Sequence, residues 1–465
     1  MAFRGRDAEL TQLRREFEAK RASLMVIYGR RRIGKSELIR EAARALPHVF
    51  YQATRVTSAL NLEAFKGEIA RSLGADDVLG SIGDWFGVLA WLARKAETRP
   101  GLVVVLDEFP YLVEDNPALP SIVQKLWDSK APELGRLKIV LCGSMIAHME
   151  DLLAERNPLY GRKTLSLDLG PLPLRDAARF FPGYSADDVF MAYGIFGGVP
   201  HYLRLCDPDS TLADNVVRLM LSNTGALVDE PTVLLQSELR DIHRYASILA
   251  AIAGGCTKYG EIIGRTGDTD SKRISPYLDR LQRMRLIRSV RSMDAAANSR
   301  DRRYFVADPL VGFWHRFVRP NLSSVAQGFG GAVWLHQIAP KLTEFMGVAF
   351  EEMCRDHVRR HIQERLVVPA RDIGQVWGSD YDIDIAGQLL DGSMLFGECK
   401  WAQTEIGEGV LDTMLARSAA TTYGLGEQRR HFALYARSGF RAGLRERAAE
   451  DGSVSLYSLA DMLGT

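Results

Sequence analysis

The chain has few cysteines, no long apolar run and almost no net charge. Its five cysteines are scattered through 465 residues without a CxxC or Cys/His spacing. That distribution argues against a zinc module or a disulfide framework and fits a reducing cytosol. No run of about eighteen apolar residues occurs, and the start MAFRGRDAEL lacks the apolar core of a signal peptide, so we expect a cytoplasmic protein that makes no membrane contact. The net charge of +1 predicts no partner and makes local charge the informative quantity.

Length and composition place the chain among globular proteins. With 465 residues, 46% of them hydrophobic and 25% charged, it has an ordinary composition and is too long for one core. We expect roughly two to four domains.

A phosphate-binding loop lies near the N-terminus, in SLMVIYGRRRIGKSELIREA. It has the G-x4-G-K-S signature, between an apolar strand pattern over 24–28 and a helical pattern that follows. The glycines let backbone N–H groups surround a phosphate, the lysine reaches the β- and γ-phosphates, and the serine offers a hydroxyl to Mg²⁺. We expect an ATP site at these residues: Gly29, Arg30, Arg31, Arg32, Ile33, Gly34, Lys35, Ser36 and Glu37.

Two later apolar runs supply the other groups that an ATPase needs. The run over 102–106 ends at Asp107, the expected second Mg²⁺ ligand, and Glu108 is the candidate that polarises the attacking water. The run over 137–144 ends at Ser144, which either senses the γ-phosphate or caps the next helix. Strand patterns alternate with helical patterns, which predicts an α/β fold with a doubly wound parallel sheet and the nucleotide at its carboxyl edge.

Six segments occur in one order: FRGRDAEL, GRRRIGKS, LVVVLDEF, LCGSM, NPLYGRK and FGGVPHYL. In this order the chain resembles the archaeal-type ATPase family, which is related to AAA+ and STAND ATPases. The resemblance implies that Gly198 and Pro200 belong to a helical lid over the nucleotide. It implies that Arg162 stabilises charge, acting on a neighbouring subunit of a homo-oligomer; a surface salt bridge is the alternative. It also implies that three residues line the adenine side: Phe3, Gly5 and Arg6.

The middle of the chain predicts two further parts. After an ATPase core over 1–170, residues 171–231 have a helical pattern and form the expected lid. Residues 232–310 predict three short helices and a β-hairpin, the elements of a winged helix-turn-helix. Ser275 is expected to cap the third helix, with Pro276 in its first turn.

The predicted winged helix is basic. Between residues 265 and 303 there are eleven Lys/Arg and five Asp, a net charge of +6. Basic residues on the third helix and on the hairpin would meet the phosphates of one DNA duplex, and such contacts give affinity without sequence specificity. A protein-binding winged helix is the alternative. The expected DNA contacts are Arg273, Arg280 and Arg283 on one helix face, with Arg300, Arg302 and Arg303 on the wing.

Beyond an expected linker over 311–340, which includes the Gly-rich joint 327–331, residues 341–465 predict another α/β domain. Its first helix, TEFMGVAFEEMCRDHVRRHI, is amphipathic. Glu351 lies at the border of the apolar face and can turn inward, whereas Glu352 and Arg355 are expected to face water.

The segment SDYDIDIAGQLLDGSMLFGECKW predicts a hairpin whose turn decides its chemistry. A two-residue loop would place Asp384 opposite Cys399. A three-residue loop over 390–392 would place Asp384 opposite Glu398, with Gly392 in a left-handed conformation. Because residues two apart share a face of a strand, Lys400 would join them in the second case. We expect the three-residue loop.

Asp384, Glu398 and Lys400, with Glu351 from the preceding helix, resemble the core of PD-(D/E)xK nucleases. The resemblance implies that Asp384 and Glu398 hold Mg²⁺ and that Lys400 orients the attacking water. We expect the carboxyl groups of Asp384, Glu398 and Glu351 to lie within about 4–6 Å of one another, so that a single divalent ion could bridge them. Two departures are Ile383 in place of proline and Asp382 as a rival ligand. The spacing D-x13-E-x-K alone is a weak signal.

Together these features predict an ATP-binding and ATP-hydrolysing protein that acts on double-stranded DNA. The expected activity is metal-dependent endonuclease cleavage controlled by the nucleotide state. Two alternatives remain open: a STAND-type signalling or scaffold ATPase, and a DNA-binding regulator whose nuclease-like domain does not cleave.

Overall fold

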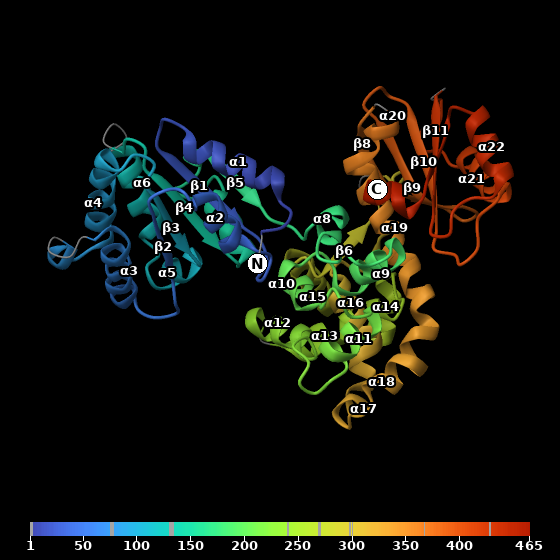
Figure 1. The fold of residues 1–465 in the computed structure, drawn as a ribbon, viewed down its shortest axis with the longest axis horizontal. Helices are drawn as coiled ribbons and strands as arrows, with labels where there is room; N and C mark the ends of the chain where they lie inside the picture. The colour runs from blue at the N-terminus through green and yellow to red at the C-terminus, as the bar shows by residue number, and fades with distance from the viewer. Residues whose placement is uncertain are drawn as a thin grey trace. The chain divides into compact units, whose positions relative to one another are not determined.

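The computed structural model describes residues 3–74, 79–129, 134–239, 241–267, 271–296, 299, 301–366, 368–426 and 429–465. The chain divides into two compact units, whose elements are drawn in Figure 1. The first unit holds residues 1–172 with 199–201, and the second holds residues 173–198 with 202–465. In the part of the chain that the structure describes, no helix is both long and apolar enough to cross a membrane.

A parallel sheet of five strands forms the centre of the first unit, in the order β2-β3-β4-β1-β5 (Figure 1). Its strands are β1 (Ser23–Tyr28), β2 (His48–Gln52), β3 (Val103–Asp107), β4 (Lys138–Gly143) and β5 (Leu165–Asp168). Every residue of β1, β3 and β4 is buried, which is why their sequences are continuous apolar runs. The predicted parallel α/β sheet is confirmed.

Helices connect these strands and cover the sheet. They are α1 (Asp7–Glu18), α2 (Lys35–Ala43), α3 (Ser58–Leu73), η1 (Leu79–Ser81), α4 (Trp85–Thr98), α5 (Phe109–Asp115), α6 (Leu119–Ser129) and α7 (Ile146–Leu153). Phe65 of α3 and Trp85 of α4 stack and are buried in one core with β2 and β3. The P-loop lies between β1 and α2, at the carboxyl end of the strand.

The second unit begins with helices α8 (Leu174–Ala178), α9 (Ala186–Phe196), α10 (Pro200–Leu205), α11 (Leu212–Met220) and α12 (Glu230–Glu238). The first two residues of α10 belong to the first unit. Three helices and an antiparallel hairpin follow: α13 (Ile242–Ala253), α14 (Tyr259–Thr266), α15 (Ser271–Arg283), β6 (Ile287–Val290) and β7 (Arg303–Val306). These are the elements expected there, and their assignment as a winged helix stays a prediction.

The start of α15 differs from the sequence prediction. The helix begins at Ser271, so Ser275 does not cap it and Pro276 lies inside it. Proline removes one backbone hydrogen bond. The extra turn buries Ile274 in the same core as Leu278, and this burial offsets the lost bond.

The expected linker over 311–340 is largely helical. It contains α16 (Pro309–Phe313), η2 (Trp314–Val318), η3 (Arg319–Asn321), α17 (Leu322–Ala326), α18 (Gly330–Val333), η4 (Trp334–Ile338) and η5 (Ala339–Lys341). Trp314 and Phe317 are buried, so apolar packing orders this segment. A Cβ on Gly330 would lie 1.9 Å from the Leu221 carbonyl oxygen. Glycine at this joint therefore serves close packing of the backbone.

A mixed sheet of five strands forms the C-terminal domain, in the order β12-β11-β10-β9-β8. Its strands are β8 (Ala370–Trp377), β9 (Asp382–Leu389), β10 (Met394–Lys400), β11 (Arg430–Ala436) and β12 (Val454–Tyr457). The strands from β8 to β10 are antiparallel neighbours, and those from β10 to β12 are parallel neighbours. The domain's helices are α19 (Leu342–His361), α20 (Gln363–Leu366), α21 (Glu408–Ala420), α22 (Ala442–Glu450) and α23 (Leu459–Leu463).

Ion pairs and close packing join α8 and α9 to the C-terminal domain. Arg437 forms two hydrogen bonds with Asp187 of α9, at 2.5 and 2.7 Å. Arg175 of α8 pairs with Glu364 at 2.8 Å. A Cβ on Gly194 would lie 2.5 Å from the sulfur of Met346, so α9 packs closely on α19. The helices α8 and α9 therefore belong to the same compact unit as the C-terminal sheet.

Candidate functional site

The P-loop has the backbone shape that its glycines predict. Gly29 has a φ of +151°, and a Cβ there would lie 2.3 Å from the Leu169 carbonyl oxygen. Gly34 has a φ of +89°, and Arg32 a φ of +67°. The Lys35 Nζ donates hydrogen bonds to the carbonyl oxygens of Gly29 and Arg30, at 2.8 and 3.1 Å. The lysine thus lies over the loop, and a bound phosphate would replace these carbonyls as its hydrogen-bond acceptor.

Ser36 and Asp107 meet beside the P-loop. The Ser36 hydroxyl donates to the Asp107 Oδ2 at 2.6 Å. A hydroxyl and a carboxylate are hard oxygen ligands of the kind Mg²⁺ takes, alongside water and nucleotide phosphates. The two residues, 71 positions apart in the chain, therefore fit the ion expected of them.

Glu108 is half-buried and is hydrogen-bonded by Ser144. Its Oε2 accepts hydrogen bonds from the Ser144 N–H at 3.1 Å and from the Ser144 hydroxyl at 2.9 Å. Glu108 has a φ of +53°, which is uncommon for a residue with a side chain. The N-cap of α7 is Met145, so Ser144 does not cap that helix. The expected alternative, a cap on the next helix, is therefore wrong, and the role of Ser144 as a γ-phosphate sensor stays a prediction.

Among the residues expected around the nucleotide, two contact the P-loop and a third forms a salt bridge. Arg6 is buried and donates to the Ile33 carbonyl at 3.0 Å and the Gly170 carbonyl at 2.6 Å. Pro200 packs on Gly34, with its Cγ 3.6 Å from the point where a Cβ would stand. Arg162 forms two hydrogen bonds with Asp128, at 2.9 and 2.8 Å, and matches the salt-bridge alternative.

The C-terminal hairpin has the three-residue turn. The Leu389 N–H donates to the Ser393 carbonyl at 2.8 Å, and Gly392, with a φ of +87°, donates to the Leu389 carbonyl at 3.1 Å. The ladder pairs Gly397 with Ile385, so the next step brings Asp384 level with Glu398. The predicted register is confirmed, and Asp384 does not pair with Cys399 in the ladder. Its Oδ2 instead accepts a hydrogen bond from the Cys399 N–H at 2.9 Å.

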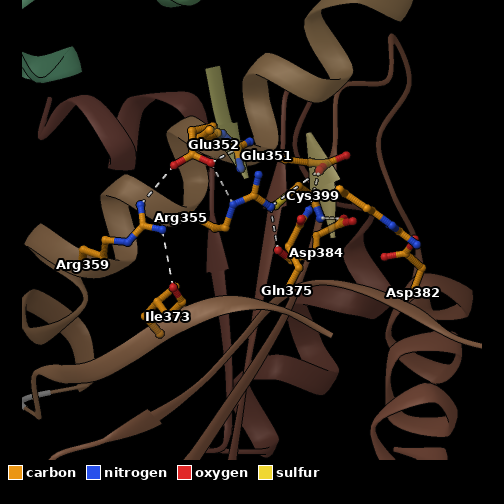
Figure 2. Close-up of polar contacts among 11 residues, drawn as sticks. Glu351, Glu352, Arg355, Arg359, Ile373, Gln375, Asp382, Asp384 and Cys399 are labelled. Carbon is orange, nitrogen blue, oxygen red and sulfur yellow. Dashed lines mark hydrogen bonds and ion pairs between the residues drawn. The ribbon is translucent and has the colours of Figure 1, made fainter. Parts of the chain in front are cut away.

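Arg355 lies at the centre of the contacts on the α19 side of the hairpin (Figure 2). Its Nη1 donates to the Asp384 carbonyl oxygen at 2.8 Å and lies 3.6 Å from the Glu351 Oε2. Its Nε donates to Glu352 at 3.1 Å. The Glu351 Oε2 also accepts from Gln375 at 3.2 Å. Arg355 is 2% exposed, so the expectation that it faces water is wrong.

Two cations hold Glu398 on the other side of the hairpin. The Lys400 Nζ donates to its Oε1 at 2.6 Å. The Arg417 Nη1, from α21, lies 3.2 and 3.3 Å from its two oxygens. The same Nη1 donates to the Asp382 carbonyl oxygen at 3.1 Å.

The three acids do not converge as expected. Glu398 and Cys399 point to opposite faces of β10, and Cys399 touches Cys354 of α19. Glu351, also on α19, therefore approaches from the face opposite to Glu398. Among the described residues, no group of three or more His, Cys, Asp or Glu side chains is arranged to hold a metal ion. The expectation of one ion bridging all three acids is not met. Asp384 and Glu398 still fit an ion that takes its other ligands from water and a phosphate.

Charge is crowded around Asp384. Burial raises its pKa to about 7, and the neighbouring charges of Glu351 and Glu398 add to the effect. Burial also raises the pKa of Glu351. For Lys400, burial lowers the pKa, but the hydrogen bond and charge of Glu398 outweigh it, so the pKa is raised. A buried carboxyl with such a pKa is a frequent property of functional sites.

Comparison with known proteins places the first part of the chain. Residues 3–205 match a family model described as an ATPase domain predominantly from Archaea. The match supports an ATPase domain in this part of the chain. It reaches past the expected core at residue 170 as far as α10, and the expected domain bounds stay predictions. Residues 314–410 match a second model, described as archaeal and bacterial proteins of unknown function. The nuclease assignment therefore stays a prediction.

Individual relatives cover most of the chain. An uncharacterised protein of Methanocaldococcus jannaschii is 28% identical over 403 residues, 86% of this chain and 87% of that protein. The Walker-type ATPase of Pyrococcus abyssi has a TM-score of 0.51 and 20% identity, over 67% of this chain and 96% of that chain. The Aeropyrum pernix ORC2 protein, in ADPNP–ADP complexes, has a TM-score of 0.45 and 16% identity, over 71% of this chain and 95% of that chain.

The residues expected to bind DNA are only partly available for it. Arg283 and Arg302 are exposed, and Arg280 is half-buried. Arg303 pairs with Asp382 at 2.8 Å and lies over the Trp377 ring at 4.3 Å, so it holds the hairpin to the C-terminal domain. Arg300 and the side chain of Arg273 lie outside the described residues.

The sequence prediction missed Gln375 and Arg417, and it assigned Arg355 to the surface. The spacing of Arg355, four residues after Glu351, was a usable signal because such pairs meet on one helix face. Arg417 had no such signal. It lies 19 residues from Glu398, and only the packing of α21 on β9 and β10 brings them together.

Proposed function

We propose that this chain binds and hydrolyses ATP and uses the nucleotide state to control a C-terminal domain that cleaves double-stranded DNA. The observation that carries the proposal is the set of contacts at the ATPase domain: Ser36 with Asp107, and Glu108 with Ser144. Ser36 and Asp107 would hold Mg²⁺, which would offset the negative charge of the nucleotide phosphates. Lys35 would leave its two carbonyls for those phosphates, and Glu108 would orient the attacking water.

Nucleotide binding and hydrolysis can be separated by two variants. Lys35→Ala removes the cation that faces the phosphates and should abolish ATP binding. Glu108→Gln keeps the shape of the side chain but not its charge, so it should bind ATP and lose hydrolysis by roughly 100-fold or more. Calorimetry of ATP binding and a phosphate-release assay give both results. Unchanged binding and turnover in Lys35→Ala would remove the P-loop from the proposal.

DNA cleavage is supported by the hairpin. Its register brings Asp384 level with Glu398, and Lys400 pairs with that glutamate at 2.6 Å. A divalent ion bound there would polarise the scissile phosphate and lower the pKa of a bound water. In the reaction, water adds to phosphorus and the bond to one sugar oxygen breaks. Lys400 would orient that water, and the carboxylate of Asp384 would be a ligand of the cation.

A second function is favoured by the ion pairs of the same site. Each acid already has a protein partner: Glu351 has Arg355, Asp384 has the Cys399 N–H, and Glu398 has Lys400 and Arg417. A site neutralised in this way suits a DNA-binding regulator or a STAND-type scaffold whose C-terminal domain binds a partner without cleaving. Such a protein would still hydrolyse ATP.

One experiment separates these functions. Supercoiled plasmid and linear duplex are incubated with the whole chain and Mg²⁺ or Mn²⁺, with and without ATP. The nuclease proposal expects nicking or linearisation by the wild type, none by Asp384→Ala or Lys400→Ala, and equal ATP hydrolysis in all three. DNA that stays intact under every condition, with normal ATP hydrolysis, would favour the regulator or scaffold.

A further inference from the structure

Glu398 is paired with two cations in the C-terminal site. Its side chain is 5% exposed, and it accepts hydrogen bonds from Lys400 and Arg417 together. One carboxylate thus faces two cations, and Asp384 is a further charge near Lys400. A divalent cation that takes Glu398 as a ligand must compete with both.

The two cations are held differently. Lys400 follows Glu398 on the same strand and has that carboxylate as its hydrogen-bond partner among the described residues. Arg417 reaches in from α21, and its Nη1 also donates to the Asp382 carbonyl oxygen at 3.1 Å. That second contact keeps the guanidinium at the edge of the site when Glu398 is withdrawn.

Arg417 has unused donors. In the described part of the chain its hydrogen bonds all involve Nη1, which leaves Nε and Nη2 without a protein partner. The side chain is 34% exposed, so these groups reach solvent. Guanidinium N–H groups in this fork geometry match two oxygens of a phosphate.

We propose that Arg417 is a DNA phosphate-binding residue of this site, held by Glu398 until a divalent cation takes that carboxylate. The inference rests on the proposed DNA cleavage and names a residue for it. When a cation occupies Glu398, the guanidinium loses its counter-ion but stays on the Asp382 carbonyl. A backbone phosphate of the duplex then becomes its partner. Metal and DNA therefore bind cooperatively through one arginine.

The proposal predicts opposite effects of one substitution on two ligands. Arg417→Ala removes the cation that competes for Glu398, so Mn²⁺ binding by the protein alone should tighten by about threefold or more. The same variant loses a phosphate contact, so duplex binding in Ca²⁺ should weaken about tenfold. Arg417→Lys keeps the positive charge, so its affinities for Mn²⁺ and for duplex should lie between those of the wild type and those of Arg417→Ala. Free Mn²⁺ is measured by electron paramagnetic resonance, and DNA binding by fluorescence anisotropy.

Arg447→Ala is the matched control. Arg447 lies on α22 and pairs with Asp412 of α21, so it tests loss of a surface arginine from the same domain; it should keep wild-type affinities for both ligands. Weaker Mn²⁺ binding by Arg417→Ala, with thermal unfolding unchanged, would show that the arginine only positions Glu398 and would overturn the inference. Unchanged DNA affinity would overturn it as well. A wild type that binds neither Mn²⁺ nor duplex would overturn the proposed cleavage itself.

Discussion

At three positions in this chain, the backbone conformation or the burial of the side chain restricts which amino acid fits. Gly29 is one, because the carbonyl of Leu169 occupies the place of a side chain. Glu108 is another, with a left-handed backbone at the end of β3 that turns its carboxylate to Ser144. His315 is a third: it is buried, and neither ring nitrogen has a hydrogen-bond partner among the described residues.

Gly29→Ala should destabilise the ATPase domain. The new Cβ would lie 2.3 Å from the Leu169 carbonyl oxygen, and the φ of +151° disfavours any side chain. We expect a loss of about 2–3 kcal/mol in the free energy of unfolding. Gly67→Ala is the control: it lies in α3 with nothing within 4 Å of a Cβ, and should gain about 0.5–1 kcal/mol. Denaturant titration measures both, and equal effects would contradict the close contact.

His315 should make the second unit sensitive to acid. Burial lowers its pKa from 6.5 to about 3, and the charge of Arg319 adds to the effect. Below pH 6.5 the unfolded chain binds a proton at this residue and the folded chain does not, so stability falls as the pH falls. At pH 5 this loss is about 2 kcal/mol. His315→Leu should match the wild type at pH 7.5 and exceed it at pH 5. Parallel Tm profiles of the two proteins would rule this out.

At the scale of elements, the register of the hairpin of β9 and β10 could be predicted from the sequence. The packing of helices against that hairpin could not. A glycine at residue 392 and the two-residue period of a strand fix the turn and the partner of Asp384. Nothing local fixes the strand face on which α19 packs. That packing puts Glu351 opposite to Glu398 and buries Arg355, whose charge had indicated a surface position. The same limit applies to α15, where the burial of Ile274 outweighed a proline signal.

Two neighbouring arginines in the hairpin of β6 and β7 are expected to have different roles, and this difference can be tested. Arg302 is exposed, whereas Arg303 is engaged by Asp382 and Trp377. Arg302→Glu should therefore weaken duplex binding and lower the slope of affinity against salt by about one unit. Arg303→Glu should mainly lower the Tm, because it faces Asp382 with a like charge. Anisotropy titrations at several salt concentrations, with melting curves, separate the two. Equal loss of DNA affinity would mean that Arg303 leaves Asp382 and Trp377 to bind DNA.

At the scale of the whole molecule, the two units should respond differently to nucleotide. Each has its own core, so calorimetry should resolve two transitions. ATP with Mg²⁺ at about 100 times its Kd would stabilise the unit that binds it by about 2.7 kcal/mol, raising one Tm by several degrees. Lys35→Ala should show the same two transitions without the shift. A single transition that moves as a whole would indicate that the units unfold together.

Residues 199–201 belong to the first unit, although the chain on both sides of them belongs to the second. A recombination event that replaced only residues 1–172 would separate the P-loop from Pro200. The stretch that matches the ATPase family model ends at residue 205 and so includes Pro200. That piece carries α8 and α9, whose arginine and aspartate must find Glu364 and Arg437 in whatever follows. Chimaeras of distant relatives are therefore expected to keep these two ion pairs, and the stability that they contribute, when both halves come from one parent.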